Sequence, residues 1–345
     1  MACFHPVIAH EHSAPGDYNQ TRSFSFRPSF RSDDVIKFPC GKCIGCRSDR
    51  ARDWTYRCIM ESVTSPPAYF VTLTYSDEEV PLSAGVSLAS PALSGSPYPV
   101  FDEYGHSVLV PEPSSSVKFH YSLRADDMRL FFMQVTKRLG PVRKLYSGEY
   151  GSRTLRPHYH AIIFGLGLDD LKFHSYNDFA QPLFVSESLS RCWYNSRTRR
   201  IRGNVLVSEA NPSTMAYTAG YTLKKLGSSK RDYEKLGIEP EFIRTSRRPG
   251  IGMEFFSQHL DLVYGGAIHI PTPSGSVSVR CPSAFRRIHS SSDPASALWL
   301  SMERARFNKF KDELTLSLTD LDEYAIMSIK EMSLKNRRAG FKTVL

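Results

Sequence analysis

The feature that most constrains this chain is a run in which two histidines flank one bulky residue and open an apolar, β-branched stretch, His158-Tyr159-His160-Ala161-Ile162-Ile163-Phe164. Such a run is typical of a β-strand, where successive side chains alternate between the two faces. His158 and His160 are therefore expected on one face, about 7 Å apart along the strand. Two imidazoles on one face can chelate a divalent metal. The alternative is an ordinary pair of packed or surface histidines.

A second strand-like run lies just upstream, Arg143-Lys144-Leu145-Tyr146-Ser147-Gly148-Glu149-Tyr150. The short connection between the two runs favours an antiparallel hairpin. Directly opposed residues share a face, so a pairing of Glu149 with His158 would bring the carboxylate beside both histidines. Glu149, His158 and His160 would then form a site with two nitrogen ligands and one oxygen ligand, which suits Mg²⁺ or Mn²⁺. A solvated carboxylate at a sheet edge is the alternative for Glu149.

A third element, residues 211–227, carries the signals of a helix: an asparagine N-cap, a proline in the first position and a closing glycine. On this helix Tyr217, Tyr221 and Lys224 fall at i, i+4 and i+7, which places them on one stripe. Tyrosines at this spacing are often ordinary core contacts. Here Lys224 and Lys225 follow the stripe, and a core stripe seldom ends in two ammonium groups.

Together these groups suit chemistry on a phosphodiester. Glu149, His158 and His160 would hold a metal that acts as a Lewis acid on the scissile phosphate. A tyrosine hydroxyl would attack in line and expel the 3′-oxygen, leaving a 5′-phosphotyrosine link. The unperturbed pKa of tyrosine is about 10, so Lys224 would assist through its charge or would hold the phosphate. The covalent link retains the energy of the phosphodiester, so the break can later be resealed.

The H-hydrophobic-H strand, the upstream Gly-Glu-Tyr-Gly and the Tyr-x-x-x-Tyr-x-x-Lys helix resemble the HUH superfamily of rolling-circle replication endonucleases. They are most similar to the replication initiators of microviruses, and in particular of the gokushovirus branch. Further similar segments are Cys40-Gly41-Lys42-Cys43-Ile44-Gly45-Cys46-Arg47, Tyr69-Phe70-Val71-Thr72-Leu73-Thr74-Tyr75 and Ser246-Arg247-Arg248-Pro249-Gly250-Ile251-Gly252. The resemblance covers roughly residues 39–252.

This resemblance implies an origin-specific enzyme that nicks and joins single-stranded DNA through a 5′-phosphotyrosine and so starts and ends rolling-circle replication. It implies a ferredoxin-like or RNA-recognition-motif-like antiparallel sheet. The implied substrate is viral single-stranded or supercoiled origin DNA, with a host helicase and the host replication machinery as partners. An HUH transposase is one alternative. A non-enzymatic, zinc-bearing DNA-binding protein, in which the histidines and tyrosines are structural, is another.

The formal charge of +9 and the pI near 9.1 favour a polyanionic partner. Part of this charge lies in clusters, and arginine binds phosphates in a bidentate manner and reads guanine edges. The residues expected to bind DNA are Arg197, Arg199, Arg200, Arg202, Lys225, Arg247 and Arg248. A solvated loop is the alternative for the first cluster, which immediately precedes a predicted strand, 203–208.

Cys40, Cys43 and Cys46 follow a C-x₂-C-x₂-C spacing, which is tight enough for several thiolates to meet one structural Zn²⁺. Cys58 or Cys3 would supply a fourth ligand, and neither lies at a diagnostic spacing. The alternative is a turn that carries cysteines and binds no metal. The odd count of seven cysteines argues against a closed set of disulfides.

These patterns predict an α+β fold with an antiparallel central sheet, flanking helices, an N-terminal arm and C-terminal helices. Three parts are expected: residues 1–66 with the cysteines and a helix, an HUH core at 67–228 with a long insertion at 76–120, and a C-terminal extension at 229–345 with a basic segment. Helices are expected at 47–63, 122–139, 294–314 and 318–335, with a central strand at 69–75. The absence of a long apolar stretch and of a signal peptide predicts an intracellular protein that does not enter a membrane. The resemblance implies that its compartment is the cytoplasm of a bacterial host.

Overall fold

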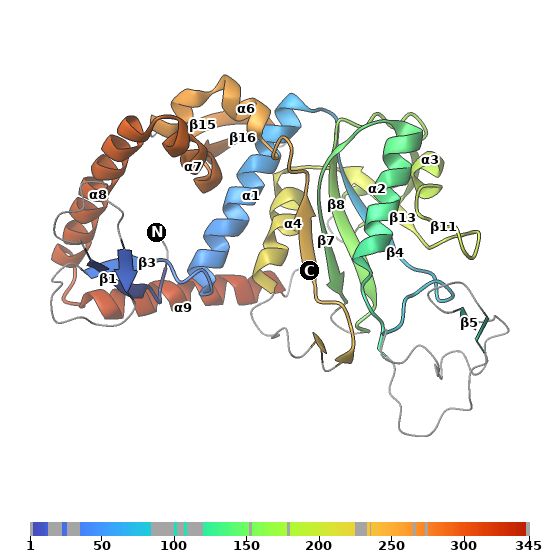
Figure 1. Ribbon diagram of the computed structural model, residues 1–345, viewed down its shortest axis with the longest axis horizontal. Coiled ribbons are helices and arrows are strands. Elements are labelled where there is room, and N and C mark those ends of the chain that lie inside the picture. The colour runs from blue at the N-terminus through green and yellow to red at the C-terminus, as the bar shows by residue number, and fades with distance from the viewer. Residues whose placement is uncertain are drawn as a thin grey trace. The chain divides into compact units, whose positions relative to one another are not determined.

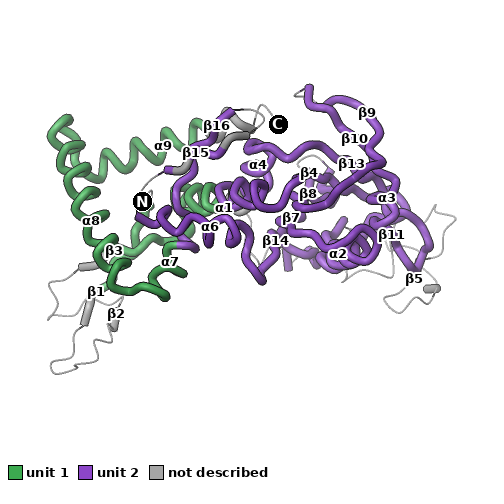
Figure 2. The backbone as a smooth tube through the Cα atoms, turned by 90° about the horizontal axis from the view of Figure 1, so that it is seen from above, with its two compact units in different colours: residues 1–53, 286–345 green, residues 54–285 purple. Residues whose placement is uncertain are grey.

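The structure is a computed structural model of the 345-residue chain, and it describes residues 3–12, 23–25, 35–83, 100–101, 107–108, 120–151, 154–177, 180–224, 233–234, 236–264, 267–272 and 275–342. The chain forms two compact units, residues 1–53 with 286–345, and residues 54–285 (Figure 2). The insertion expected at 76–120 lies largely outside the described residues.

The first unit combines short strands with long helices, which are β1 (Val7–His12), β2 (Ser23–Ser25), β3 (Val35–Phe38), α8 (Pro294–Ser317) and α9 (Glu323–Lys342). Within the expected N-terminal arm the strands pair antiparallel in the order β2-β1-β3. Helix α1 (Ile44–Thr64) begins in this unit and ends in the second, and α7 (Ser283–Ser292) spans the other boundary. The expected helices at 47–63 and 294–314 are therefore confirmed, and the helix expected at 318–335 is present but begins at Glu323 and continues to Lys342. Among the described helices, none has the length and apolarity that crossing a bilayer requires.

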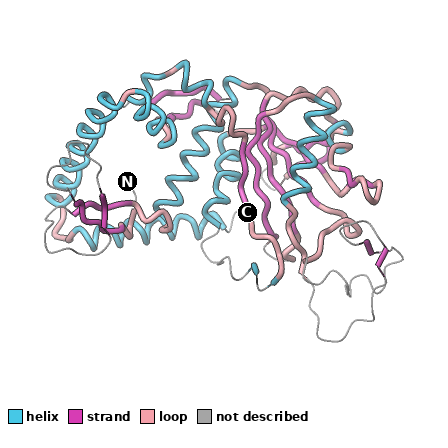
Figure 3. The backbone as a smooth tube through the Cα atoms, in the orientation of Figure 1, coloured by secondary structure: helices cyan, strands magenta, loops and turns pink. Residues whose placement is uncertain are grey.

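The second unit is built on the strands β4 (Ala68–Thr74), β7 (Arg143–Tyr150), β8 (Pro157–Phe164), β9 (Lys172–Tyr176), β10 (Pro182–Val185), β13 (Val205–Glu209) and β14 (Phe242–Thr245). They form one seven-stranded sheet in the order β14-β7-β8-β4-β13-β10-β9, and every neighbouring pair is antiparallel. The strands are drawn in magenta in Figure 3. The strand expected at 69–75 is thus confirmed in the centre of the sheet. The α+β fold with an antiparallel central sheet is confirmed with it.

The remaining elements of this unit are α2 (Ala125–Leu139), α3 (Glu187–Ser190), α4 (Pro212–Lys224), α6 (Met253–Gln258), a 3₁₀ helix (Leu260–Tyr264) and the short strands β5 (Val100–Phe101), β6 (Ser107–Val108), β11 (Tyr194–Asn195), β12 (Arg200–Ile201), β15 (Ala267–Thr272) and β16 (Gly275–Arg280). The last six pair as the hairpins β5-β6, β11-β12 and β15-β16. Strand β4 is followed by the small hairpin β5-β6, by α2 and then by β7 and β8. Within the central sheet this gives the β-α-β-β order that opens a ferredoxin-like domain.

The two faces of the central sheet have different roles. One face packs against α2 in an apolar core that includes Val71, Leu73, Met128, Phe131, Phe132, Val135, Tyr159, Ala161 and Trp193. Because side chains alternate along a strand, the residues between these core positions point to the opposite face. Helix α4 covers that second face and packs against β7, β8 and β14 (Figure 1). The face under α4 carries both histidines of β8.

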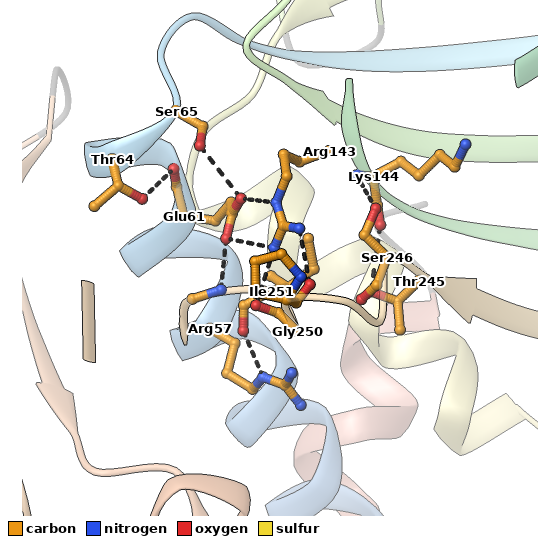
Figure 4. Close-up of polar contacts among 12 residues, drawn as sticks. Arg57, Glu61, Thr64, Ser65, Arg143, Lys144, Thr245, Ser246, Gly250 and Ile251 are labelled. Atoms are coloured by element: carbon orange, nitrogen blue, oxygen red, sulfur yellow. Dashed lines mark hydrogen bonds and ion pairs between the residues drawn. The ribbon is translucent and has the colours of Figure 1, made fainter. Parts of the chain in front are cut away.

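A buried carboxylate, Glu61 near the end of α1, holds the segment that follows β14 (Figure 4). Its Oε1 accepts a hydrogen bond from Arg143 Nε, and its Oε2 accepts one from the backbone N–H of Gly252 at 2.6 Å. Arg143 in turn donates to the carbonyls of Pro249 at 2.8 Å and Gly250 at 2.9 Å. The ion pair of Glu61 and Arg143 thereby joins the end of α1, the start of β7 and the turn after β14. This turn carries Arg247 and Arg248.

Replacing Glu61 by glutamine is expected to lower the free energy of unfolding by about 3 kcal/mol, because Arg143 would lose its counter-ion inside a hydrogen-bonded network. Urea denaturation followed by circular dichroism measures this change. The matched control is Glu187→Gln, which breaks an exposed pair with Arg191 on α3 and should change the stability by less than about 0.5 kcal/mol. Equal effects of the two substitutions would show that the buried network does not stabilise the fold.

Candidate metal and nucleophile site

The two strands that carry the predicted metal ligands pair in the expected register. Strands β7 and β8 form an antiparallel hairpin in which Glu149 lies opposite His158 and Ser147 lies opposite His160. Glu149 and both histidines therefore share the face of the sheet that lies under α4. The predicted hairpin is confirmed, and it brings the three side chains together.

The ligand atoms of these three residues lie within 4.8 Å of one another. Glu149 Oε1 is 2.6 Å from His158 Nε2 and 3.3 Å from His160 Nε2. The side chains of Glu149 and His160 are 5% and 9% exposed, whereas that of His158 is 22% exposed. The cluster is thus closed on the side of the sheet and accessible at His158.

Neighbouring groups fix the orientation of both imidazoles. Thr72 Oγ1 on β4 lies 3.1 Å from His160 Nδ1, and the carbonyl oxygen of Arg156 lies 3.2 Å from His158 Nδ1. Partners at Nδ1 direct both Nε2 atoms towards Glu149. Such second contacts are what metal-binding histidines ordinarily make, because they set the tautomer and the ring orientation.

The electrostatics of the cluster favour an anionic carboxylate. Burial alone would raise the pKa of Glu149, but hydrogen bonds from His158 and His160, with the attraction of their charge, hold that pKa well below its usual range. Glu149 is therefore ionised at neutral pH and available as a metal ligand.

The donor set and its spacing fit a small divalent cation. An octahedral ion with bonds of 2.0–2.1 Å separates adjacent ligand atoms by roughly 3 Å, and the distances from Glu149 Oε1 to the two Nε2 atoms lie on either side of that value. The hydroxyl of Ser147, opposite His160, is also buried and has no hydrogen-bond partner in the part of the chain that the structure describes. This face therefore has polar groups placed to receive an ion or its water.

Helix α4 brings a tyrosine to this cluster. Its start is set by Asn211, whose Oδ1 accepts the backbone N–H groups of Ser213 at 2.9 Å and Thr214 at 3.0 Å, as predicted for the N-cap. Within the helix the ring of Tyr217 lies 5.3 Å from the ring of His160, edge to face. Phe70 on β4 stacks on the His160 ring at 5.3 Å between ring centroids, and it also meets the Tyr217 ring edge to face at 6.2 Å.

The other two predicted catalytic residues lie on the same helix. Tyr221 and Lys224 occupy backbone positions one and nearly two turns beyond Tyr217, on the same stripe of α4. The expected helix end at Gly227 lies outside the described residues, as does Lys225. The side chain of Tyr217 thus contacts the cluster of Glu149, His158 and His160, and the backbones of Tyr221 and Lys224 lie on the same stripe of the helix.

Five of the six predicted DNA-binding arginines are exposed and one is buried. Arg197, Arg199 and Arg200 are exposed on the β11-β12 hairpin, and Arg247 and Arg248 are exposed on the turn after β14. Arg202 differs: it is 8% exposed, and its NH2 lies 2.9 Å from Asp127 Oδ1 in a buried ion pair below the core face of the sheet. Its guanidinium also lies over the ring of Trp193. Arg202 is therefore a buried residue whose side chain makes contacts within the fold.

In the structure Cys3 lies beside the three cysteines of the predicted cluster. The sulfur atoms of Cys3, Cys40, Cys43 and Cys46 all lie within 4.8 Å of one another. Cys58, the other candidate ligand, is a buried residue of α1 and is not part of this group.

Sequence reasoning missed the residues that β4 contributes to the site, Thr72 and Phe70. The alternation of side chains along β4 is the pattern that points to them. Tyr69, Val71 and Leu73 belong to the core face, so the residues between them lie on the face that α4 covers. The alternation alone did not show that β4 pairs with β8, with Thr72 opposite His160.

Comparison with the sequences of known proteins places the chain in a family. The chain is 30% identical to the replication-associated protein ORF2 of Spiroplasma virus 4 over 299 residues, which cover 83% of this chain and 80% of that protein. It is 26% identical to the replication-associated protein VP4 of Bdellovibrio phage phiMH2K over 279 residues, 80% of this chain and 73% of that protein. No protein-family model and no solved structure matches the chain. The chain therefore belongs to the replication-associated proteins of microvirus-like phages.

Proposed function

We propose that this protein initiates rolling-circle replication of a phage genome by nicking and rejoining single-stranded DNA at the origin, with a tyrosine as the nucleophile. Membership in a family of phage replication-associated proteins supports a role in replication. The observation that carries the chemistry is the contact of the Tyr217 ring with His160, inside a cluster of two histidines and one glutamate. The protein would act in the cytoplasm of the bacterial host, followed by a host helicase and the host replication machinery.

Glu149, His158 and His160 are the residues that would hold a divalent cation, Mg²⁺ or Mn²⁺. When bound there, such a cation supplies Lewis-acid polarisation of a phosphate oxygen. Thr72 and the carbonyl of Arg156 keep the histidine Nε2 atoms directed at the cluster. Glu149 balances part of the cation's charge and remains ionised at neutral pH for the reason given above.

The chemical step forms one bond and breaks one bond. The phenolic oxygen of Tyr217 or Tyr221 attacks phosphorus, the bond between phosphorus and the 3′-oxygen breaks, and the proton lost by the tyrosine is balanced by the one gained at the 3′-hydroxyl. The 5′-phosphate remains on the tyrosine, so attack by a 3′-hydroxyl reverses the step and reseals the strand. Lys224, on the same stripe, would favour the phenolate through its charge. The spacing of the two tyrosines would let one hold DNA while the other makes a second cut.

Exposed arginines would bind the DNA backbone. Arg197, Arg199 and Arg200 lie together on the β11-β12 hairpin, and Arg247 and Arg248 lie on the turn that Glu61 and Arg143 hold in place. Contacts of this kind with phosphates supply most of the affinity for nucleic acid and position it without reading its sequence. Lys225, the next residue in the sequence after α4, would add a further cation.

Covalent trapping tests the proposal. The purified protein is incubated with Mn²⁺ and the circular single-stranded genome that encodes it, or with oligonucleotides that tile that genome, and is then boiled in detergent. A DNA-linked protein band is expected, and EDTA should prevent its formation. Absence of the band on every oligonucleotide, with DNA binding intact, would instead support the non-enzymatic DNA-binding alternative. Cleavage confined to the phage origin distinguishes an initiator from a transposase.

A further inference from the structure

We propose that Cys3, Cys40, Cys43 and Cys46 bind one structural zinc ion, at a site separate from the proposed nicking site. All four thiols belong to the first compact unit, whereas Glu149, His158 and His160 belong to the second. The site would tie the N-terminal segment that precedes β1 to the start of α1.

The sulfur positions fit a single tetrahedral ion. Zinc–thiolate bonds of about 2.3 Å place the four sulfur atoms of a tetrahedral site roughly 3.8 Å apart. The four sulfur atoms here all lie within 4.8 Å of one another, so a contraction of at most about 1 Å per pair would close the site. This spacing suits one ion at the centre and leaves no room for a cluster of several metals. Four soft thiolates in a tetrahedral arrangement are the donor set that Zn²⁺ prefers in structural sites.

The backbone around the sulfur atoms is arranged as it would be around thiolates. Cys40 Sγ accepts backbone N–H groups from Lys42 at 3.4 Å and from Cys43 at 3.2 Å. Cys3 Sγ accepts the backbone N–H of Cys40 at 3.2 Å. Gly41 adopts a φ of +70°, a left-handed conformation that suits glycine and that makes the tight turn between the first two ligands of the C-x₂-C-x₂-C segment.

The start of α1 adds a further electrostatic contribution. Cys43 immediately precedes the first residue of this 21-residue helix, and Cys46 lies in its first turn. The N-terminus of a helix carries partial positive charge and stabilises thiolates. Cys46 also donates its backbone N–H to Cys43 Sγ at 3.5 Å. Two of the four ligands thus lie at the positive end of this helix.

The exposure of the four cysteines argues against simple packing. Cysteines that only fill space are buried, as Cys58, Cys192 and Cys281 are in this protein. In the cluster only Cys43 is buried, while Cys3, Cys40 and Cys46 are partly exposed. None of the seven cysteines, all of which lie in the described part of the chain, is paired in a disulfide. A partly exposed set of four converging thiols is better explained by a shared ligand than by the core.

Metal analysis of the full-length protein, purified without added metal or chelator, tests this proposal. Inductively coupled plasma mass spectrometry should find about one zinc per chain. X-ray absorption at the zinc edge should show four sulfur neighbours at about 2.3 Å. Titration with a mercurial reagent should release the zinc as thiols are modified, which a chromogenic chelator reports. Absence of bound metal, iron in place of zinc, or nitrogen and oxygen neighbours around the zinc would overturn the proposal.

Variants then assign the ligands. Cys3→Ser and Cys46→Ser should each retain less than about one tenth of the zinc, whereas the matched control Cys192→Ser, outside the cluster, should retain all of it. His160→Ala should also retain the zinc, which separates this site from the nicking site and makes the two proposals fail independently. Full zinc content in both Cys3→Ser and Cys46→Ser would refute the assignment. If these variants do not fold, the X-ray absorption and mercurial measurements on the unmodified protein still decide it.

Discussion

Replacement of both Tyr217 and Tyr221 by phenylalanine is expected to abolish the covalent protein–DNA adduct, with a loss on the order of 10³-fold or more, as when a nucleophile is removed from other enzymes that form covalent intermediates. The substitution removes two hydroxyl groups and keeps the aromatic rings, so the contact of the Tyr217 ring with His160 can persist. Single-stranded DNA binding should change little, because it depends mainly on contacts with phosphates. Adduct yield is measured on detergent gels with a labelled oligonucleotide, and affinity by fluorescence anisotropy.

The single variants refine this result. Tyr217→Phe is expected to lose more of the first cleavage than Tyr221→Phe, because the ring of Tyr217 contacts His160, one of the proposed metal ligands. The matched control is Tyr176→Phe, an exposed tyrosine on the edge strand β9, which should keep full activity. Mass spectrometry of the trapped peptide should locate the 5′-phosphate on one of the two helix tyrosines. An adduct on Tyr150, Tyr159 or a serine would show that the nucleophile lies elsewhere.

Loss of a metal ligand is expected to have the second large effect. His160→Ala and His158→Ala should each reduce Mn²⁺-dependent nicking by at least about 100-fold, since a change in a group that only supports a ligand already costs roughly 10–100-fold. Thr72→Val, which keeps the shape of the side chain but removes the partner of His160 Nδ1, should fall within that smaller range. Nicking is measured as the conversion of a labelled oligonucleotide across a titration of Mn²⁺.

The control for this series is His174→Ala, which removes an exposed histidine from β9 and should leave nicking unchanged. DNA binding should survive in all three site variants, so that a loss of cleavage reports on chemistry. A partial recovery of Thr72→Val at high Mn²⁺ would indicate weakened metal affinity, as expected of an orienting group. Full cleavage by His160→Ala would refute the metal site.

Much of the candidate site follows from the sequence because its determinants are local. The alternation of a strand puts His158 and His160 on one face whatever the strand pairs with, and the short connection to the preceding strand makes the Glu149 register a local property as well. The start of α4 is likewise set by Asn211 and the residues that directly follow it. The common stripe of Tyr217 and Tyr221 then follows from helical geometry.

The tertiary structure decided what depends on contacts between distant segments. Only the pairing of β4 with β8 brings Thr72 to His160, and only the packing of α4 on β7, β8 and β14 brings Tyr217 to the same imidazole. For the same reason the sequence did not show whether Cys3 or Cys58 is the fourth thiol of the cluster, or that Arg202 is buried against Asp127. Spacing along a chain determines which side chains share a face, because backbone geometry repeats over a few residues. Which faces meet depends on the packing of the whole unit, which no short segment encodes.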